Sequence, residues 1–208
     1  MKIKNKFYMP DEDTHFTGED YQIPHRLNSM RHVKEFKVAV DVGAHIGTWA
    51  IDLVRYFEDV WCFEPIEEHR KCLIQNLSIF KKQNYTILPY ALGNEDDKEV
   101  SLDYVAEGNS GTASITPNGK YTATIKTFDS FNIPRIDYLK VDIEGFELQF
   151  LEGARETIKR TKPVMNIEIK DTCERFNVSP EQIKHFITKE LGMFCVGQTV
   201  KDFIYLYK

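Results

Sequence analysis

The chain has 208 residues, a hydrophobic share of 42%, a charged share of 28% and a formal net charge of -5. This composition is that of an ordinary globular domain with a large core, which excludes disordered and fibrous classes. The negative balance argues against a nucleic-acid partner, because binding to phosphate backbones normally requires a basic surface.

Targeting and redox signals are weak in this sequence. No apolar run approaches the ~18 residues of a membrane span, and residues 1–6 lack the apolar segment of a signal peptide. We therefore expect a cytoplasmic protein without a membrane span. The four cysteines form no C-x-x-C pair and no zinc spacing with histidine, so we expect buried, reduced thiols.

Residues 1–35 are expected to form an N-terminal arm, and residues 36–208 one α/β domain. The arm mixes charged and aromatic residues, and two interpretations remain open. It is either solvated or folded over a ligand pocket as a lid. The lid would bring three side chains toward the ligand: His15, Phe16 and Tyr21.

Strand-like and helix-like patterns alternate from residue 38 onward, which predicts a Rossmann-like, mostly parallel sheet. The expected parallel strands lie in residues 38–42, 59–63, 85–92, 136–145 and 163–169. The expected helices cover residues 27–36, 46–57, 66–82, 147–160 and 180–190. Two strand-like runs within 95–130 predict an inserted hairpin beside the active site, and residues 193–207 suit a closing antiparallel pair.

The loop after the first strand indicates which ligand to expect. Residues 38–47 run from an apolar strand through Asp41, Gly43 and Gly47 into a helix. Glycine allows a sharp turn and a close approach of a ligand to the backbone. The loop lacks the G-x-G-x-x-G spacing of a dinucleotide site, and a carboxylate suits an amino group better than a pyrophosphate. S-adenosylmethionine (SAM), which carries an ammonium and a sulfonium but no phosphate, is therefore the expected cofactor.

A second carboxylate, Glu64, ends the next strand 21 residues after Gly43. This is close to the interval at which a strand-end acid binds ribose hydroxyls in Rossmann folds. The alternative is a plain β-α-β unit whose glycines serve only the turn. The backbone past the third strand would border the adenine. The cofactor-binding candidates are Asp41, Gly43, Ala44, His45, Ile46, Gly47, Glu64, Pro65, Ala91 and Leu92.

Acidic residues at the strand ends also supply candidates for catalysis. Methyl transfer to a hydroxyl needs an aligned acceptor oxygen and a base that takes its proton. Asp142 is expected to face the methyl group, and Glu144 or Glu168 to act as the base. Alternatively, these acids together hold a divalent metal, or Glu144 caps the following helix. Other candidate bases are His15, His45 and His69.

Six motifs, taken in order, resemble the FkbM family of SAM-dependent methyltransferases. They are VDVGAHIG at 40–47, FEP at 63–65, ALGN at 91–94, TFD at 127–129, IDYLKVDIEGFE at 136–147 and PVMNIE at 163–168. The resemblance implies the seven-stranded Rossmann-like class I methyltransferase fold, with SAM over the first loop and Glu64 on its ribose. It also implies O-methylation of a small-molecule or saccharide acceptor. Two other functions remain open, a non-catalytic SAM-binding subunit and an N- or RNA methyltransferase, and the oligomeric state is not indicated.

Overall fold

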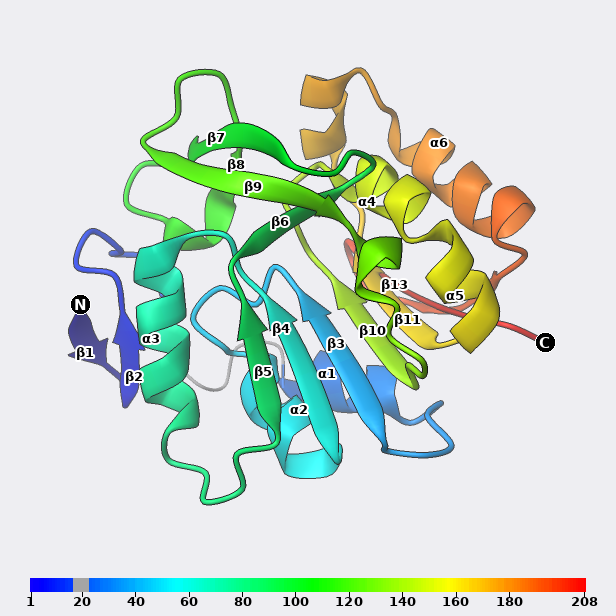
Figure 1. Ribbon diagram of the computed structural model, residues 1–208, viewed down its shortest axis with the longest axis horizontal. Helices are drawn as coiled ribbons and strands as arrows, with labels where there is room; N and C mark the ends of the chain where they lie inside the picture. Colours follow the sequence, from blue (N-terminus) through cyan, green and yellow to red (C-terminus); the bar gives the residue numbers. More distant parts are fainter. Residues whose placement is uncertain (17–22) are drawn as a thin grey trace.

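A mixed β-sheet forms the centre of the computed structural model, which describes residues 1–16 and 23–208 (Figure 1). Across the described residues its seven strands follow the order β12-β13-β11-β10-β3-β4-β5, which confirms the predicted seven-stranded sheet. The five strands from β11 to β5 are parallel, and β13 and β12 close one edge in antiparallel pairing. Their bounds are β3 (Val38–Val42), β4 (Asp59–Phe63), β5 (Tyr85–Leu88), β10 (Tyr138–Val141), β11 (Val164–Glu168), β12 (Phe194–Gln198) and β13 (Asp202–Leu206).

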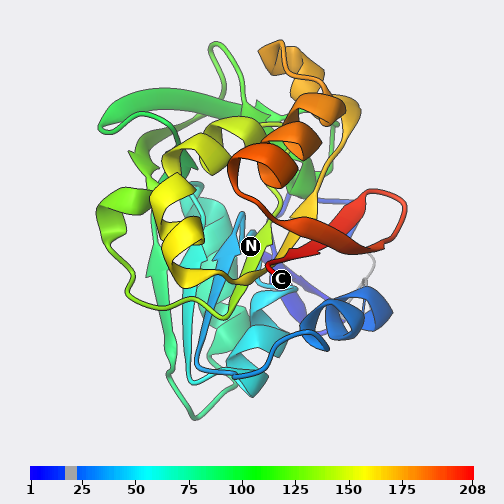
Figure 2. The same ribbon diagram turned by 90° about the vertical axis from the view of Figure 1, so that its right-hand side faces the viewer.

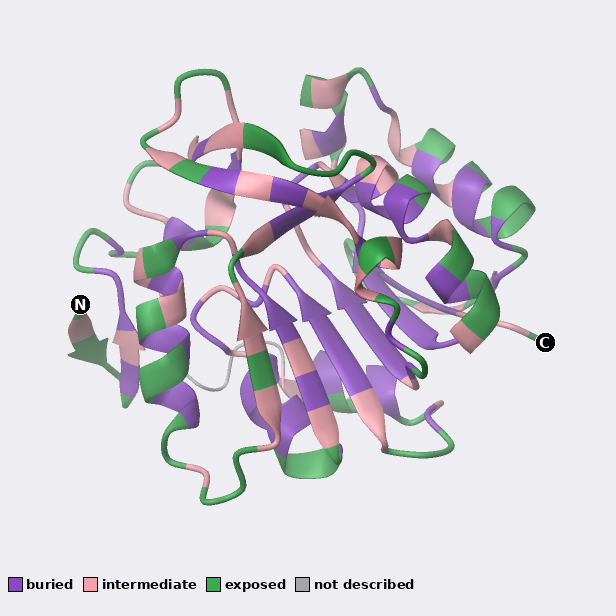
Figure 3. Ribbon diagram, viewed as in Figure 1, coloured by how far each residue is buried: buried purple, intermediate pink, exposed green. Residues whose placement is uncertain are grey.

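The central strands are apolar because both faces of the sheet are covered. Figure 3 shows β3, β10 and β11 as almost continuously buried. One face packs against α4 (Glu147–Gly153), α5 (Arg155–Thr161) and α6 (Pro180–His185). The other packs against α1 (Ile23–Met30), α2 (Ala50–Tyr56) and α3 (Glu67–Leu77), so the sheet is the middle of three layers (Figure 2).

A second, four-stranded sheet lies beyond the carboxyl ends of β3, β4 and β5 (Figure 1). Its order is β6-β9-β7-β8, with β6 (Tyr90–Gly93), β7 (Lys98–Tyr104), β8 (Ala113–Ile115) and β9 (Tyr121–Thr127). The antiparallel pair β7 and β9 is the predicted inserted hairpin. β6, which follows β5 in the chain, pairs in parallel with β9. The inserted hairpin is therefore joined to the segment that leaves the main sheet.

Several expected boundaries are wrong. The expected strand over 85–92 breaks at Pro89, which has no backbone N–H to donate, and its second half joins the other sheet. The helix expected over 27–36 ends at Met30, and the helix expected from residue 46 begins at Ala50. The helix expected over 147–160 is two helices divided at Ala154. The last expected helix changes to a π-helix, η4 (Phe186–Glu190), and the 3-10 turns are η1 (Ser110–Thr112), η2 (Phe128–Phe131) and η3 (Asp171–Phe176).

The first part of the N-terminal arm belongs to the core. Its hairpin, β1 (Lys2–Lys4) and β2 (Phe7–Met9), packs beside α3, and Met9 is fully buried. The Asn76 amide accepts from the N–H of Tyr8 at 2.7 Å and donates to the carbonyls of Tyr8 and Ile46 at 2.9 and 2.7 Å. These bonds tie the arm to the loop after β3.

Two remaining expectations concern cysteine and the membrane. All four thiols are free, and three are buried, but Cys195 is exposed, so the expectation of burial is wrong at that position. Throughout residues 1–16 and 23–208, every helix is too short or too polar to span a bilayer.

Candidate active site

Two adjoining pockets open at the carboxyl edge of the main sheet. Pocket A lies under the small sheet and encloses about 610 Å³ of empty space, open solvent included. Its lining includes Glu64, Pro65, His69, Ala91, Leu92 and Phe146. Pocket B lies beside the arm, with a lining that includes Asp13, His15, Phe16, Asp41, Ala44, Trp49, Lys140 and Lys170. Five residues line both pockets: Gly43, His45, Gly111, Asp142 and Glu144.

The loop after β3 has a backbone path that requires glycine. Gly43 and Gly47 adopt φ values of +79° and +94°, which disfavour any residue with a Cβ. A Cβ at Gly43 would lie 1.9 Å from the carbonyl oxygen of Asp142. Gly43 therefore lets the loop lie directly against the end of β10. Ile46 is buried beneath the loop and, like Gly47, lines neither pocket.

Glu64 is a buried carboxylate held by three donors. Its Oε2 accepts from the N–H of His45 at 2.8 Å, and its Oε1 accepts from the N–H of Ile66 at 2.9 Å and from Nδ1 of His69 at 3.1 Å. Burial alone would raise its pKa, but the His69 contact, together with the other donors, lowers the pKa below its usual value. Glu64 is therefore ionised and acts only as an acceptor on the wall of pocket A.

His45 links the glycine loop to the arm. Its Nε2 lies 2.8 Å from the hydroxyl of Ser110, and that hydroxyl donates to Asp13. Because the Ser110 proton is committed to Asp13, Nε2 of His45 is the donor to Ser110. Burial lowers the pKa of His45 to about 3, so the ring is neutral. Hydrogen bonds thus connect the loop after β3, through His45 and Ser110 of η1, to Asp13 of the arm.

Asp41 pairs in register with Lys140 on the next strand, at the floor of pocket B. Burial raises the pKa of Asp41 to about 7, and its Oδ2 has no hydrogen-bond partner among the described residues. Burial would lower the pKa of Lys140, but the charges of Asp142 and Asp41 outweigh it and raise that pKa. Lys140 places its Nζ 3.3 Å from Asp142 and 5.1 Å from the centre of the Trp49 ring.

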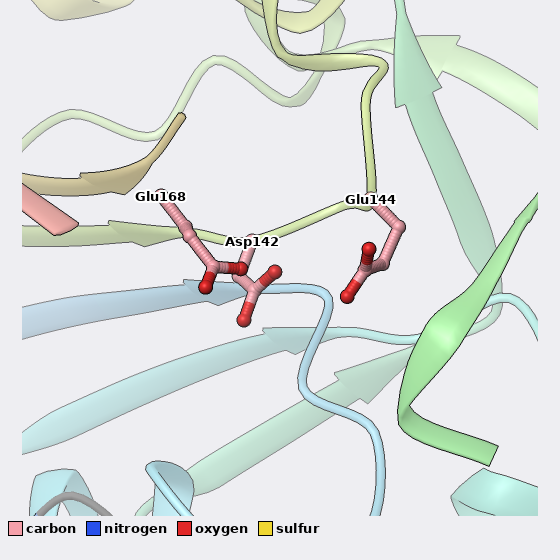
Figure 4. A group of neighbouring side chains, drawn as sticks. All are labelled: Asp142, Glu144 and Glu168. Atoms are coloured by element: carbon pink, nitrogen blue, oxygen red, sulfur yellow. The ribbon is translucent and has the colours of Figure 1, made fainter. Parts of the chain in front are cut away.

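The predicted catalytic acids come together where β10 and β11 end (Figure 4). Asp142, Glu144 and Glu168 offer oxygens that all lie within 4.8 Å of one another. A lysine that sequence reasoning missed lies among them, because Nζ of Lys170 is 2.7 Å from Oε1 of Glu144 and 2.5 Å from Oε2 of Glu168. The acidic group is therefore already paired with two internal cations, Lys140 at Asp142 and Lys170 at Glu144 and Glu168.

The charges within this group are unequal. Burial opposes ionisation of Asp142, but Lys140 and Lys170 hold its pKa well below the usual range. Burial raises the pKa of Glu168, and the neighbouring charge of Asp142 raises it further. We therefore expect Asp142 to be ionised and Glu168 to keep its proton near neutral pH.

Glu144 differs from the other two acids in its position. It lines both pockets, whereas Glu168 lines neither. Its φ of +55° is a strained conformation for a residue other than glycine, a feature that clusters at functional sites. It does not cap α4, which has no side-chain cap; its carboxylate is paired with Lys170 instead. Burial, followed by the charge of Asp142, raises its pKa.

The other predicted positions divide between the pockets. Pro65, Ala91 and Leu92 line pocket A, Ala44 lines pocket B, and His15 and Phe16 of the arm also line pocket B. Tyr21, the third residue of the expected lid, lies outside the described residues. Asp13 and Ser110 carry no local motif and were not predicted. The only sequence signal for Lys170 is its place two residues after the acid that ends β11.

Comparison with known proteins identifies the family. The model of the methyltransferase FkbM domain matches residues 41–193, which includes the glycine loop and the ends of β10 and β11. The chain belongs to the FkbM methyltransferase family. This FkbM-family chain is 27% identical over 137 residues to the hexuronic acid methyltransferase AglP of Haloferax volcanii. The match covers 62% of this chain and 55% of AglP, so the chain spans about half the length of that relative.

Solved structures share the fold of this FkbM-family chain. The FkbM methyltransferase of Methylobacillus flagellatus aligns with a TM-score of 0.59 at 20% identity, over 86% of this chain and 47% of that one. The precorrin 8w decarboxylase of Methanobacterium thermoautotrophicum aligns with a TM-score of 0.56 at 16% identity, over 100% of both chains. These likenesses confirm the Rossmann-like class I methyltransferase fold.

Proposed function

We propose that this chain is a SAM-dependent O-methyltransferase that methylates a hydroxyl of a saccharide or another small molecule. Family membership supports methyl transfer. Transfer to an acceptor bound beside the cofactor is supported by one structural observation, that the two pockets meet at Gly43, Asp142 and Glu144. A cofactor in one pocket would thus face an acceptor in the other across a shared carboxylate wall. Such placement of two reactants is the main requirement of a transfer reaction.

Pocket A and the adjoining floor of pocket B fit the parts of SAM. Glu64 would receive a ribose hydroxyl, and Ala91 and Leu92 would border the adenine. Asp41, whose Oδ2 has no hydrogen-bond partner among the described residues, would receive the ammonium group, and Gly43 lets the loop that carries it lie directly against the end of β10. When bound, SAM supplies an electrophilic methyl group on its sulfonium.

The part of pocket B away from Asp41 would hold the acceptor. Glu144 is the proposed base: it accepts the proton that the acceptor hydroxyl loses as its oxygen is methylated. Lys170 holds the carboxylate of Glu144 in place from 2.7 Å. Asp142, kept ionised by Lys140 and Lys170, contributes negative charge to the wall where a cationic sulfonium would lie.

The arm contributes the outer wall of pocket B, which supports its proposed role as a lid. Asp13 is fixed by backbone donors from His15 and Phe16 at 2.9 and 3.0 Å and by the N–H of Ser110 at 3.0 Å. Phe16 also packs on Phe7 of β2, with ring centres 5.3 Å apart. Phe16, which is half-buried, gives pocket B an aromatic ring against which an apolar face of the acceptor would pack.

The saccharide class is supported by the similarity to AglP, a hexuronic acid methyltransferase. The test is transfer of a labelled methyl group from SAM to a panel of hexuronic acids, neutral sugars and other hydroxyl compounds. We expect transfer to at least one hydroxyl acceptor by the wild type and little transfer by Glu144→Gln. Binding of SAM without transfer to any acceptor would favour the non-catalytic subunit. Transfer only to amines or RNA would favour the other alternative. The net charge of -5 disfavours RNA as the acceptor.

A further inference from the structure

We propose that His69 is a positioning residue that fixes the carboxylate of Glu64 for a single ribose hydroxyl of the cofactor. This inference rests on the proposed function, because it gives a role to a residue that lies behind the proposed ribose acceptor. His69 lies in the first half of α3, is 1% exposed and lines pocket A.

Both ring nitrogens of His69 have partners. Nδ1 lies 3.1 Å from Oε1 of Glu64, and Nε2 lies 3.1 Å from the hydroxyl of Tyr104. An ionised carboxylate can only accept, so Nδ1 carries a proton whatever the state of Nε2. Tyr104 in turn accepts from the hydroxyl of Tyr121 at 3.1 Å. The chain of bonds therefore runs from the small sheet, through His69, to Glu64.

Ring packing holds His69 in this orientation. Its ring is stacked on Tyr104, with centres 5.7 Å apart and planes at 7°. Its other neighbour is the ring of His45, which it meets edge to face with centres 4.5 Å apart. Packing fixes the plane of the ring, and the hydrogen bonds select its orientation in that plane, because a ring flipped by half a turn would remove both nitrogens from their partners.

Among the described residues, the donors to Glu64 leave one acceptor position of its carboxylate unfilled. A carboxylate offers about four lone-pair sites, two on each oxygen. On Glu64, Ile66 and His69 fill both sites of Oε1, and His45 fills one site of Oε2. The remaining site, on Oε2, can receive one ribose hydroxyl. Without the Nδ1 donor, Oε1 would have an unfilled site, and only the backbone donors of His45 and Ile66 would hold the carboxylate.

The experiment compares two ligands on each protein, so that a general loss of folded protein cancels. Calorimetry measures Kd for S-adenosylhomocysteine and for its 2′,3′-dideoxy analogue with the wild type, Glu64→Gln, His69→Leu and His69→Asn. His69→Asn keeps an N–H near the position of Nδ1, whereas His69→Leu removes it. We expect the wild type to bind S-adenosylhomocysteine about tenfold or more tightly than the dideoxy analogue. In His69→Leu this preference should fall close to that of Glu64→Gln. His69→Asn should keep most of it.

Two results would overturn the role of His69 while leaving the proposed function intact. One is a His69→Leu variant that prefers S-adenosylhomocysteine over the dideoxy analogue as strongly as the wild type does, while Glu64→Gln loses this preference. The other is an equal loss in His69→Leu and His69→Asn, which would assign the effect to ring packing rather than to the donor. A wild type that binds neither ligand, or binds both equally, would instead reject the proposed ribose site at Glu64, and this inference with it.

Discussion

Glu64 and Asp41 are buried acids on neighbouring strands, yet their surroundings move their pKa values in opposite directions. The donors around Glu64, with His69 foremost, overcome the effect of burial and lower its pKa. Burial raises the pKa of Asp41 to about 7 in spite of nearby Lys140, and within the part of the chain that the structure describes its Oδ2 has no hydrogen-bond partner. At neutral pH Glu64 is a ready acceptor, whereas Asp41 is only partly ionised until a cation reaches it.

This difference predicts a pH-dependent affinity for the cofactor product. Only ionised Asp41 attracts the ammonium of S-adenosylhomocysteine, so we expect its affinity to rise as pH increases through about 7. Calorimetry from pH 6 to 8 measures this rise. Asp41→Asn is the control, and its profile should be flat over the same range. A wild-type affinity that is constant or falls with pH would exclude the ammonium contact.

The proposed base predicts a second pH effect. We expect Glu144→Gln to lower kcat by about 10²–10⁴-fold while leaving Kd for S-adenosylhomocysteine within a few-fold, because the change removes the proton acceptor and its charge beside Lys170 but no proposed contact with the cofactor. The base must be ionised, and burial raises its pKa. The acid limb of the wild-type kcat/KM profile should therefore lie above the usual value of 4.5. A Gln variant with wild-type kcat would reject Glu144 as the base.

The residue-level predictions from sequence succeeded or failed for a physical reason. Acids at the ends of parallel strands must lie near one another, so the grouping of Asp142, Glu144 and Glu168 followed from topology. Lys170 and Ser110 could not be found in this way. Their partners, Glu144 and Asp13, are 26 and 97 residues away, and only the folded chain brings them together.

At the scale of elements, strand periodicity located the buried strands but not the sheet to which each belongs. The run from residue 85 to 92 has a continuous strand pattern, yet Pro89 divides it between the two sheets. Pairing partners, rather than local propensity, decide that division. The arm shows the same effect, because β1 and β2 are short and gain stability by packing on α3.

The packed arm predicts a cost for truncating its buried residue. Met9→Ala should lower the free energy of unfolding by about 2–5 kcal/mol, since Met9 is 0% exposed and the change leaves a cavity. Ile3→Ala is the matched control, and with Ile3 63% exposed it should change stability by less than about 0.5 kcal/mol. Urea unfolding measures both. Equal, small effects would show that the hairpin is not part of the cooperative core.

At the scale of the whole molecule, three separate regions build the proposed site. The main sheet supplies the carboxylates, the small sheet roofs pocket A, and the arm forms the outer wall of pocket B. The family match begins at residue 41, so Asp13, His15 and Phe16 lie outside it. We therefore expect the arm to carry acceptor specificity particular to this chain, and the matched region to carry the cofactor site.

The central claim is that the edge formed by β3 and β4 binds a phosphate-free nucleoside through Glu64. Calorimetric titration of S-adenosylhomocysteine into the wild type and Glu64→Gln tests it most directly. We predict saturable 1:1 binding by the wild type and an affinity at least about tenfold weaker for the variant, because the variant loses a charged acceptor. No binding by the wild type, or equal binding by both proteins, would contradict the account.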